Sequence, residues 1–194
     1  MLKSFPIGGV HPSENKLSRG AAVERFPLPE TVVIPLSQHI GAPAAPVVAK
    51  GDKVLAGQLI AQSSGFVSAN IHSSVSGTVT AVDTAVNASG FRQPAITIKV
   101  EGDTWAEGID TTPEIKRECG LEPAEIVKKI ADAGIVGMGG ATFPTQVKLT
   151  PPPGKKAEFL IINGVECEPY LTADHRVMLE RGEELLIGVS ILAR

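Results

Sequence analysis

The sequence predicts an α+β chain of 194 residues, in which a small all-β domain is followed by the opening of an α/β domain. Two observations predict the β domain. Residues 1–50 contain seven prolines, which exclude a long helix, and residues 47–100 consist of short β-rich runs between glycines and serines. The third observation concerns residues 121–194, where helical periodicity, a glycine-rich loop and a continuous apolar run follow one another as in an α/β fold.

The β-rich runs set the expected strands in order. Residues 32–34 are the only clear strand core before residue 47. Glycine turns are expected over residues 50–53 and 56–58, since glycine and polar residues gather there. The remaining strand cores are residues 47–48, 54–55, 59–60, 66–67, 77–82 and 95–100. No segment of this half has a helical period, so we expect the β domain to extend over residues 31–100, after an extended segment at 1–30.

An acidic stretch follows the β domain. Residues 101–125 contain eight acidic side chains against only Lys116 and Arg117. Charge runs of this kind are usually solvated, and we interpret residues 101–120 as a linker. The alternative is a docking surface for a basic partner.

A helix is predicted between Pro123, which suits the first helical position, and Gly134, which suits the position just after the last turn. Its apolar stripe contains Ile126, Val127, Ile130 and Ala131. The opposite face carries Lys128 and Lys129, which we expect to face solvent.

The rest of the chain predicts one strand and two helices. Residues 159–162 are a short, continuous apolar run, which is typical of a buried parallel strand. Thr172 is placed to cap a helix over residues 173–181, and a second helix is predicted from Glu183 onwards. Because one strand cannot make a sheet, we expect residues 121–194 to form an incomplete α/β domain.

Composition excludes several classes of function. Hydrophobic residues make up 43% and charged residues 20%, which are values of a globular chain. A net charge of −3 argues against a strongly basic nucleic-acid-binding protein. Cys119 and Cys167 are the two cysteines, too few for a disulfide scaffold, a four-thiolate zinc site or an all-cysteine iron–sulfur cluster within this chain. We therefore expect no metal site here.

Targeting signals are also missing from the sequence. Residues 1–9 lack the apolar region of a signal peptide. The longest apolar run, residues 185–193, is about half the length of a membrane span, and Gly188 and Ser190 interrupt it. We expect a soluble and cytosolic chain.

The first stretch that suggests chemistry is the glycine loop, residues 134–148. Glycines at 134, 137, 139 and 140 allow backbone N–H groups to converge on a phosphate, and Lys148 could add a cation. The loop follows a predicted helix, so it fits neither the dinucleotide-binding fingerprint, which follows a strand, nor the Walker A spacing. The alternative is a helix stop followed by a plain turn.

The second stretch is the acid loop, residues 163–170, directly after the predicted strand. It brings together Asn163, Glu166, Glu168 and the only tyrosine, Tyr170, where α/β folds bind ligands. Glu166 and Glu168 are two residues apart, so in an extended segment they would share a face and could line one ligand. The alternative is a polar loop whose acids contact only water.

Cysteine chemistry has little support in this loop. Cys167 alone is not a metal site, and as a catalytic thiol it would need a paired base. His175 is the only nearby candidate for that base. The other histidines are scattered along the β half and are expected to be structural: His11, His39 and His72.

The β half resembles biotinyl and lipoyl carrier domains through residues 50–60 and 75–79. Those domains carry a modified lysine at a hairpin tip between the two elements. No lysine occurs here from Val54 to Ile98, so covalent attachment of biotin or lipoate at that tip is chemically excluded.

Three long motifs, in register along nearly the whole chain, resemble the C subunit of the Rnf (Rsx) ion-translocating electron-transport complex. They are residues 8–16, the glycine loop and residues 163–176. The glycine loop and residues 163–169 also resemble the flavin-binding, NADH-oxidising subunit of respiratory complex I. The resemblance implies a barrel-sandwich hybrid β domain and then, over residues 121–194, the first part of a Rossmann-like domain that holds FMN and accepts hydride from NADH.

The resemblance also implies site residues by position. Gly137, Gly139, Gly140 and Lys148 match the phosphate loop for flavin and nucleotide. Asn163 matches an amide that contacts flavin, while Glu166 and Glu168 match acids near the flavin and the nicotinamide. Hydride chemistry belongs to the flavin, so no catalytic residue is assigned within the chain.

The sequence departs from the family patterns in two ways. Met138, Thr142 and Val165 replace an arginine, a glycine and an acid of the complex I protein. The family also continues into the rest of the flavin domain and into two four-iron clusters, none of which is present, so we expect an N-terminal fragment.

For the parent protein the resemblance implies electron transfer between NADH and ferredoxin, through FMN and the iron–sulfur clusters, coupled to ion translocation by the complex. The implied partners are the other Rnf subunits, and the implied location is the inner face of the bacterial plasma membrane. The alternative is a non-catalytic, carrier-like docking module without a covalent cofactor. A separate transferase or hydrolase is disfavoured because no nucleophile–base pair is visible.

Overall fold

The computed structural model describes residues 12–194. Residues 8–11, which begin the first motif and include His11, lie outside the described residues. The chain divides into two compact units. One contains Phe26–Phe159, and the other joins the segment up to Arg25 with Leu160–Ala193. Each unit is described by itself below.

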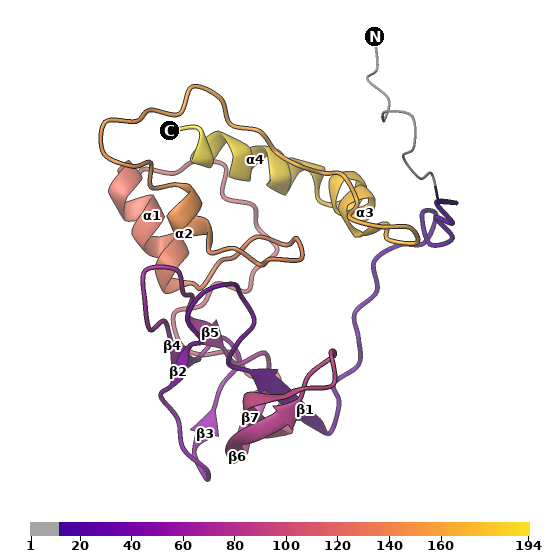
Figure 1. Cartoon of the computed structure of the whole chain (residues 1–194), viewed down its shortest axis with the longest axis vertical. Helices are drawn as coiled ribbons and strands as arrows, with labels where there is room; N and C mark the ends of the chain where they lie inside the picture. Colours follow the sequence, from indigo (N-terminus) through magenta and orange to yellow (C-terminus); the bar gives the residue numbers. More distant parts are fainter. Residues whose placement is uncertain (1–11) are drawn as a thin grey trace. The chain divides into compact units, whose positions relative to one another are not determined.

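The first unit contains a β domain built from two antiparallel sheets (Figure 1). The larger sheet has the strand order β1-β7-β6-β3 and the smaller has the order β2-β4-β5. The strands are β1 (Thr31–Pro35), β2 (Ala45–Pro46), β3 (Lys53–Val54), β4 (Leu59–Gln62), β5 (Ile71–His72), β6 (Ser76–Val86) and β7 (Arg92–Gly102).

One hydrophobic core lies between the two sheets and takes residues from both. It contains no aromatic side chain and consists of Ile34, Leu36, Ala44, Val54, Ile60, Ala61, Ile71, Val75, Val79, Ile96 and Ile98. Val79 and Ile98 are cross-strand partners on β6 and β7, and both are fully buried. Full burial of such a side chain contributes about 1.5–3 kcal/mol, so the predicted Val, Ile, Leu and Ala core accounts for this domain.

The predicted strand cores at 32–34, 59–60, 77–82 and 95–100 are confirmed, and the structure lengthens all four. The strand predicted at residues 47–48 is wrong, because pairing occurs just before it, at β2. The strand predicted at 66–67 is also wrong: the chain bends there and Phe66 is exposed. The hydroxyl of Ser68 accepts a hydrogen bond from the backbone N–H of Ser64, and such side-chain bonds replace strand pairing.

The acidic stretch begins as part of the β domain. The backbone of Thr104 and Ala106 pairs with both sides of Ala56, so the chain stays attached to the sheet beyond β7. Further along, Lys116 forms a 2.6 Å ion pair with Asp110 and holds the pKa of that carboxyl well below its usual range. The stretch therefore has local structure of its own.

Helices α1 (Pro123–Asp132) and α2 (Thr145–Lys148) complete the first unit. The predicted ends of α1 are confirmed: Pro123 is its first residue, and Gly134 follows it with a positive φ of 65°. Ile126 is buried, and the two lysines of the opposite face are exposed.

The second unit contains α3 (Ala173–Glu180) and α4 (Gly182–Leu192). Both helices begin within one residue of the predicted positions. The predicted cap is wrong in its chemistry, because the Thr172 side chain makes no capping bond. Its hydroxyl lies 2.7 Å from the Ser18 hydroxyl, and Glu166 Oε1 instead accepts the backbone N–H of His175 in the first turn of α3.

The predicted buried strand at residues 159–162 is wrong for this structure. The segment forms no strand, and the side chains of Phe159 and Ile161 are 83% and 85% exposed. A strand needs at least one neighbouring strand to pair its backbone groups, and none pairs with this segment within residues 12–194. Within that range, no helix has the length and hydropathy required to cross a lipid bilayer.

Candidate functional site

The glycine loop lies in the first unit and is closed on itself. Val136 and Pro144 form an antiparallel bridge. Next to it, the N–H of Gly137 donates to the carbonyl of Phe143 at 2.8 Å, and the N–H of Thr142 donates to the carbonyl of Gly139 at 3.0 Å. Thr142 has a positive φ of 48°. Of the four glycines, Gly134 supplies a positive φ of 65° directly after α1, and Gly137 leaves room for Lys148 Nζ.

Hydrogen-bond donors gather at the tip of this loop. Within the part of the chain that the structure describes, the backbone N–H groups of residues 138–141 make no hydrogen bond. The space beside Gly139 and Gly140 is open, with no atom within 4 Å of the position that a Cβ would take. Lys148 Nζ lies so close to Gly137 that a Cβ at Gly137 would collide with it. Free amide N–H groups beside an ammonium form the donor set that phosphate requires, so these residues fit a phosphate group.

The glycine loop is anchored to the β domain within the same unit. The N–H of Ile40 donates to the carbonyl of Ala141 at 3.0 Å, and Gln146 Nε2 donates to the carbonyl of Ser68 at 2.9 Å. Ser68 lies in the β4–β5 hairpin, residues 63–70. This hairpin lies between the two stretches that resemble carrier domains, and its hydrogen bond to Gln146 supports the loop.

Helix α1 docks on the same hairpin. Asn70 Nδ2 donates to the carbonyl of Asp132 at 3.1 Å. The carbonyl of Asn70 approaches Gly134 so closely that any Cβ there would collide with it. Glycine is therefore required at position 134 for two reasons, its positive φ and this close approach.

The two histidines of the described β domain have structural surroundings. His39 is buried, and its Nε2 accepts the backbone N–H of Ala69 at 3.0 Å. Burial lowers the pKa of His72 below its usual value, so this imidazole favours the neutral form. His72 lines an open depression of about 810 Å³ beside β1 and the β6–β7 turn, and Thr142 of the glycine loop reaches the same depression.

The acid loop lies in the second unit, apart from the glycine loop in the division of the chain. Asn163 Oδ1 accepts the N–H of Val165 at 3.0 Å, a bond within the loop itself. The chain bends at Cys167 and Glu168, so the extended geometry that would give Glu166 and Glu168 a common face is not present.

The two glutamates of the acid loop have different surroundings. Glu166 is partly buried and accepts the His175 N–H at 3.0 Å. The Glu168 side chain is exposed and has no hydrogen-bond partner among residues 12–194, while its backbone carbonyl accepts Lys16 Nζ. Only Glu168 thus keeps a carboxylate free for a ligand.

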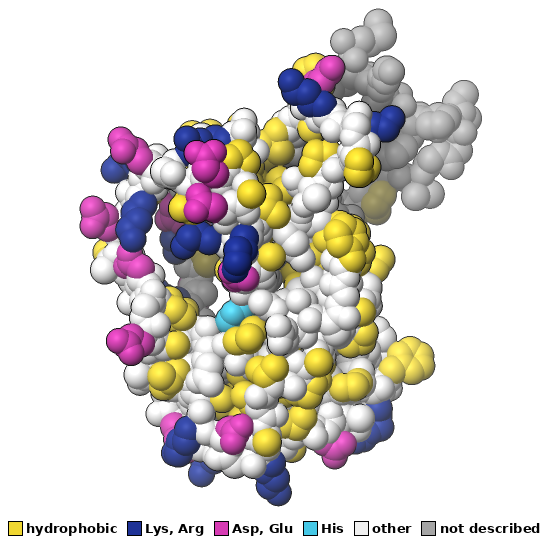
Figure 2. Space-filling model, turned by 90° about the vertical axis from the view of Figure 1, so that its left-hand side faces the viewer, with side chains coloured by type: hydrophobic (Ala, Val, Ile, Leu, Met, Phe, Trp, Pro, Cys, Tyr) yellow, Lys and Arg dark blue, Asp and Glu magenta, His cyan; other side chains and the backbone are white. Residues whose placement is uncertain are grey.

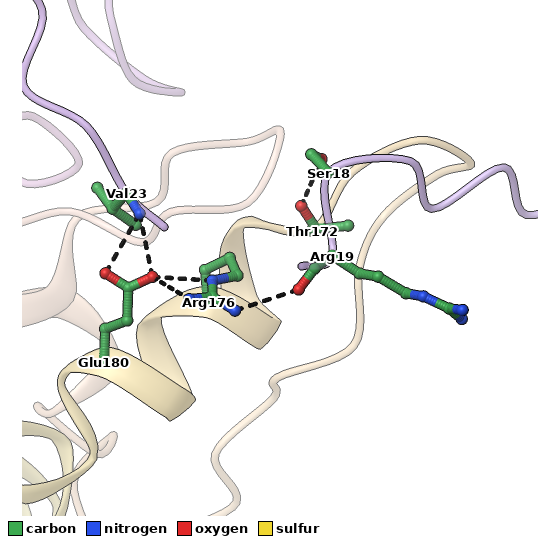
Figure 3. Close-up of polar contacts among 6 residues, drawn as sticks. All are labelled: Ser18, Arg19, Val23, Thr172, Arg176 and Glu180. Carbon is green, nitrogen blue, oxygen red and sulfur yellow. Dashed lines mark hydrogen bonds and ion pairs between the residues drawn. The ribbon is translucent and has the colours of Figure 1, made fainter. Parts of the chain in front are cut away.

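Sequence reasoning missed the residues that hold the acid loop. Residues 14–23, here called the N-terminal strap, lie along the acid loop and α3 in the second unit. Figure 3 shows the anchor at α3, where Arg176 Nε donates to Glu180 Oε1 at 2.8 Å and the same carboxylate accepts the N–H of Val23 at 3.0 Å. These two bonds hold the pKa of Glu180 below its usual value. The only signal in the sequence was the motif at residues 8–16, for which position alone gave no role.

The strap, Glu166 of the acid loop and the start of α3 line a small open pocket of about 210 Å³. Charged and titratable side chains form much of its lining: Lys16, Arg19, Glu166 and His175. Among the described residues, no group of three or more His, Cys, Asp or Glu side chains could hold a metal ion. Hydrophobic side chains also reach the surface at many places on the face shown in Figure 2.

Comparison with known proteins supports both halves of this description. The family model of the RnfC barrel sandwich hybrid domain matches residues 4–103, and the Nuo51 FMN-binding domain model matches residues 130–194. The fold class predicted from the sequence, a barrel-sandwich hybrid followed by part of an FMN-binding domain, is confirmed by these matches.

Several characterised relatives are similar over the whole chain or nearly so. The C subunit of the proton-translocating ferredoxin:NAD(+) oxidoreductase complex of Clostridium ljungdahlii is 50% identical, over 100% of this chain and 42% of the relative. The C subunit of the ion-translocating oxidoreductase complex of Rhodobacter capsulatus is 49% identical, over 100% of this chain and 37% of the relative. The C subunit of the Na(+)-translocating ferredoxin:NAD(+) oxidoreductase complex of Acetobacterium woodii is 47% identical, over 95% of this chain and 41% of the relative.

The chain thus spans between 37% and 42% of the length of these relatives. The resemblance stated from the three motifs is confirmed by the names and the extent of the matches. Because the barrel-sandwich model covers more than half of the sequence, the chain belongs to the family of C subunits of ion-translocating (Rnf) oxidoreductase complexes.

Proposed function

We propose that this chain forms the FMN phosphate site and the nicotinamide side of the C subunit in an ion-translocating oxidoreductase that transfers electrons between NADH and ferredoxin. One observation carries the proposal: the N–H groups of residues 138–141, which make no hydrogen bond within residues 12–194, lie in the same loop as Lys148. The loop falls inside the stretch similar to FMN-binding domains.

Each predicted site residue has a proposed role. The backbone at Gly137, Gly139 and Gly140 donates to the phosphate, and Lys148 neutralises its charge. Asn163 contacts the flavin, and Glu168 accepts hydrogen bonds from the nicotinamide side. Glu166 acts nearby by fixing the start of α3 rather than by offering a free carboxylate.

FMN, when bound, supplies the hydride acceptance and the one-electron steps, and the protein supplies position and charge. The two four-iron clusters, the other subunits as partners, and a peripheral position on the inner face of the bacterial plasma membrane belong to the same proposal for the whole protein. The same proposal takes residues 121–194 as the flavin and NADH part of the protein.

The test compares FMN with riboflavin, which lacks the phosphate, in the full-length protein. Lys148→Met should weaken FMN binding about three- to tenfold, since charged hydrogen bonds contribute about 1.5–3 kcal/mol and solvent exposure reduces this. Riboflavin binding should not change. The matched control is Lys155→Met, a lysine of the exposed loop after α2, which should affect neither ligand.

Fluorescence quenching of each flavin measures both affinities. Equal FMN affinity in the Lys148→Met and wild-type proteins would show that Lys148 does not serve the phosphate. An equal loss for FMN and riboflavin would show that the substitution damages the pocket as a whole, and it would also contradict the assignment.

A further inference from the structure

The N-terminal strap contacts the turn that follows Glu168. Lys16 is half-buried, and its Nζ donates to two backbone carbonyls, that of Glu168 at 3.0 Å and that of Leu171 at 2.8 Å. Between these two residues, Tyr170 donates its N–H to the carbonyl of Glu14 at 2.8 Å. Three hydrogen bonds therefore join two residues of the strap to a turn about 150 positions later in the sequence.

This turn needs external support because its backbone is strained. Tyr170 has a positive φ of 70°, a conformation that a bulky side chain rarely adopts. Such residues persist where surrounding contacts determine the conformation. The bonds from Lys16 and Glu14 supply those contacts, because they fix a carbonyl on each side of Tyr170 and its own N–H.

A second anchor lies further along the strap, at α3 (Figure 3). The Ser18 and Thr172 hydroxyls are 2.7 Å apart at the start of the helix, and Glu180 binds the Val23 N–H near its end. The strap therefore follows the whole length of α3. The family model of the barrel-sandwich domain begins at residue 4 and therefore includes the strap in the β domain. The hydrogen bonds of the strap, however, join it to the flavin half.

We propose that residues 14–23 are an integral part of the FMN-binding half of the protein, and that Lys16 is the positioning residue that holds the turn carrying Glu168. The functional part of this inference rests on the proposed function, in which Glu168 serves the nicotinamide side. Lys16 acts through the backbone of the turn and does not touch substrate. Without it, Tyr170 relaxes and Glu168 loses its fixed position.

Three variants of the full-length protein test the role of Lys16. Lys16→Met removes the ammonium and keeps the apolar stem, whereas Lys16→Arg keeps the positive charge and enough N–H donors for both carbonyls. Lys50→Met removes a lysine of an exposed β turn and is the matched control. Hydrogen exchange at residues 168–172 reports the turn directly. Steady-state kinetics with NADH report its consequence.

We expect amide exchange at residues 168–172 to become about three- to tenfold faster in Lys16→Met, because the turn loses two charge-assisted hydrogen bonds at a half-exposed site. The KM for NADH should rise by a similar factor while kcat stays within about twofold, since the turn binds and does not react. Lys16→Arg should restore most of both values, and Lys50→Met should change neither.

Two outcomes separate this inference from the proposed function. Unchanged exchange in Lys16→Met overturns the positioning role and leaves the FMN and NADH assignment untouched. Faster exchange with an unchanged KM supports the strap as part of this unit, and it overturns the placement of Glu168 at the nicotinamide. An equal loss in Lys16→Arg and Lys16→Met would also overturn the role of the donated hydrogen bonds.

Discussion

Substitutions of Glu166 and Glu168 should affect different properties of the protein, although the sequence predicted one common role for the two residues. Glu166 Oε1 accepts the N–H of His175 in the first turn of α3, where no other side chain caps the helix. Glu168 makes no side-chain bond within the described residues. The structure therefore predicts a stability defect for one substitution and a binding defect for the other.

The magnitude for Glu166 follows from helix capping. Loss of a capping side chain costs about 0.5–2 kcal/mol, and we expect Glu166→Ala to destabilise the α3 unit by about 1 kcal/mol. Glu166→Gln keeps an oxygen acceptor and loses only the charge at the helix N-terminus, so its cost should be about 0.3–1 kcal/mol. Glu168→Ala should cost almost nothing, since an exposed carboxylate without a partner loses no contact.

The assay is thermal unfolding followed by circular dichroism at the helix band, with NADH kinetics on the same samples of the full-length protein. A loss of 1 kcal/mol lowers the Tm by about 2–4 °C for a cooperative unit of about 150–250 residues, and by less for a larger one. Glu168→Gln should leave the Tm unchanged and weaken NADH use by about 1 kcal/mol or more, because hydrogen bonds to charged groups contribute about 1.5–3 kcal/mol.

The comparison between the two positions can refute this reasoning. If Glu168→Ala lowers the Tm as much as Glu166→Ala, the cap is not the source of the effect. If Glu166→Ala melts like the wild type, the capping bond contributes nothing to the stability of α3.

Four further outcomes are expected. Gly134→Ala should destabilise the first unit by at least about 1 kcal/mol more than Gly90→Ala in denaturant unfolding: both glycines have positive φ, which alone costs about 1–2 kcal/mol, but only Gly134 would also collide with the carbonyl of Asn70. Arg176 and the Val23 N–H hold the pKa of Glu180 below its usual value, so the stabilisation that Glu180 gives the folded state is present above that value and is lost as pH falls through the lower, folded-state pKa. Amide exchange at Val23, corrected for the intrinsic pH effect, should therefore rise on acidification. A Glu180→Gln protein should show no such rise. The isolated 194-residue chain should purify without FMN, and flavin bound to it would contradict this expectation. It should also self-associate through the exposed residues 159–162, and Ile161→Lys should reduce this association in sedimentation. Intact mass spectrometry should find no biotin or lipoate on Lys50, Lys53 or Lys99, and a matching mass gain at any of them would contradict this expectation.

Local signals in the sequence were enough for the elements whose ends are set by nearby residues. Pro123 and Gly134 mark the two ends of α1, because each has a backbone preference that acts at its own position. The long strands β6 and β7 follow from β-branched residues flanked by turn residues, and their pairing buries Val79 against Ile98. The start of the glycine loop is of the same kind, since Gly134 ends α1 with a positive φ.

The remaining features depend on contacts distant in sequence. The apolar run at 159–162 has the composition of a strand, but a strand forms only beside another strand, and composition does not say whether one is present. Lys16 contacts Glu168 across 152 positions, and no periodicity connects a lysine in one segment with a carbonyl in another. Thr172 was the correct residue type for a cap, yet Ser18 competes for its hydroxyl from equally far away.

The contacts of the β4–β5 hairpin also separate the two functional hypotheses. A carrier domain needs a lysine at the tip of this hairpin and freedom for the tip to move between sites. Here the hairpin has no lysine, Ser68 is bonded to Gln146 of the glycine loop, and Asn70 is bonded to Asp132 at the end of α1. Each of these bonds stabilises a fixed arrangement within the first unit. The hairpin therefore lacks both features of a carrier domain, and its bonds to the glycine loop and to α1 favour the proposed cofactor site over a docking module that works without a cofactor.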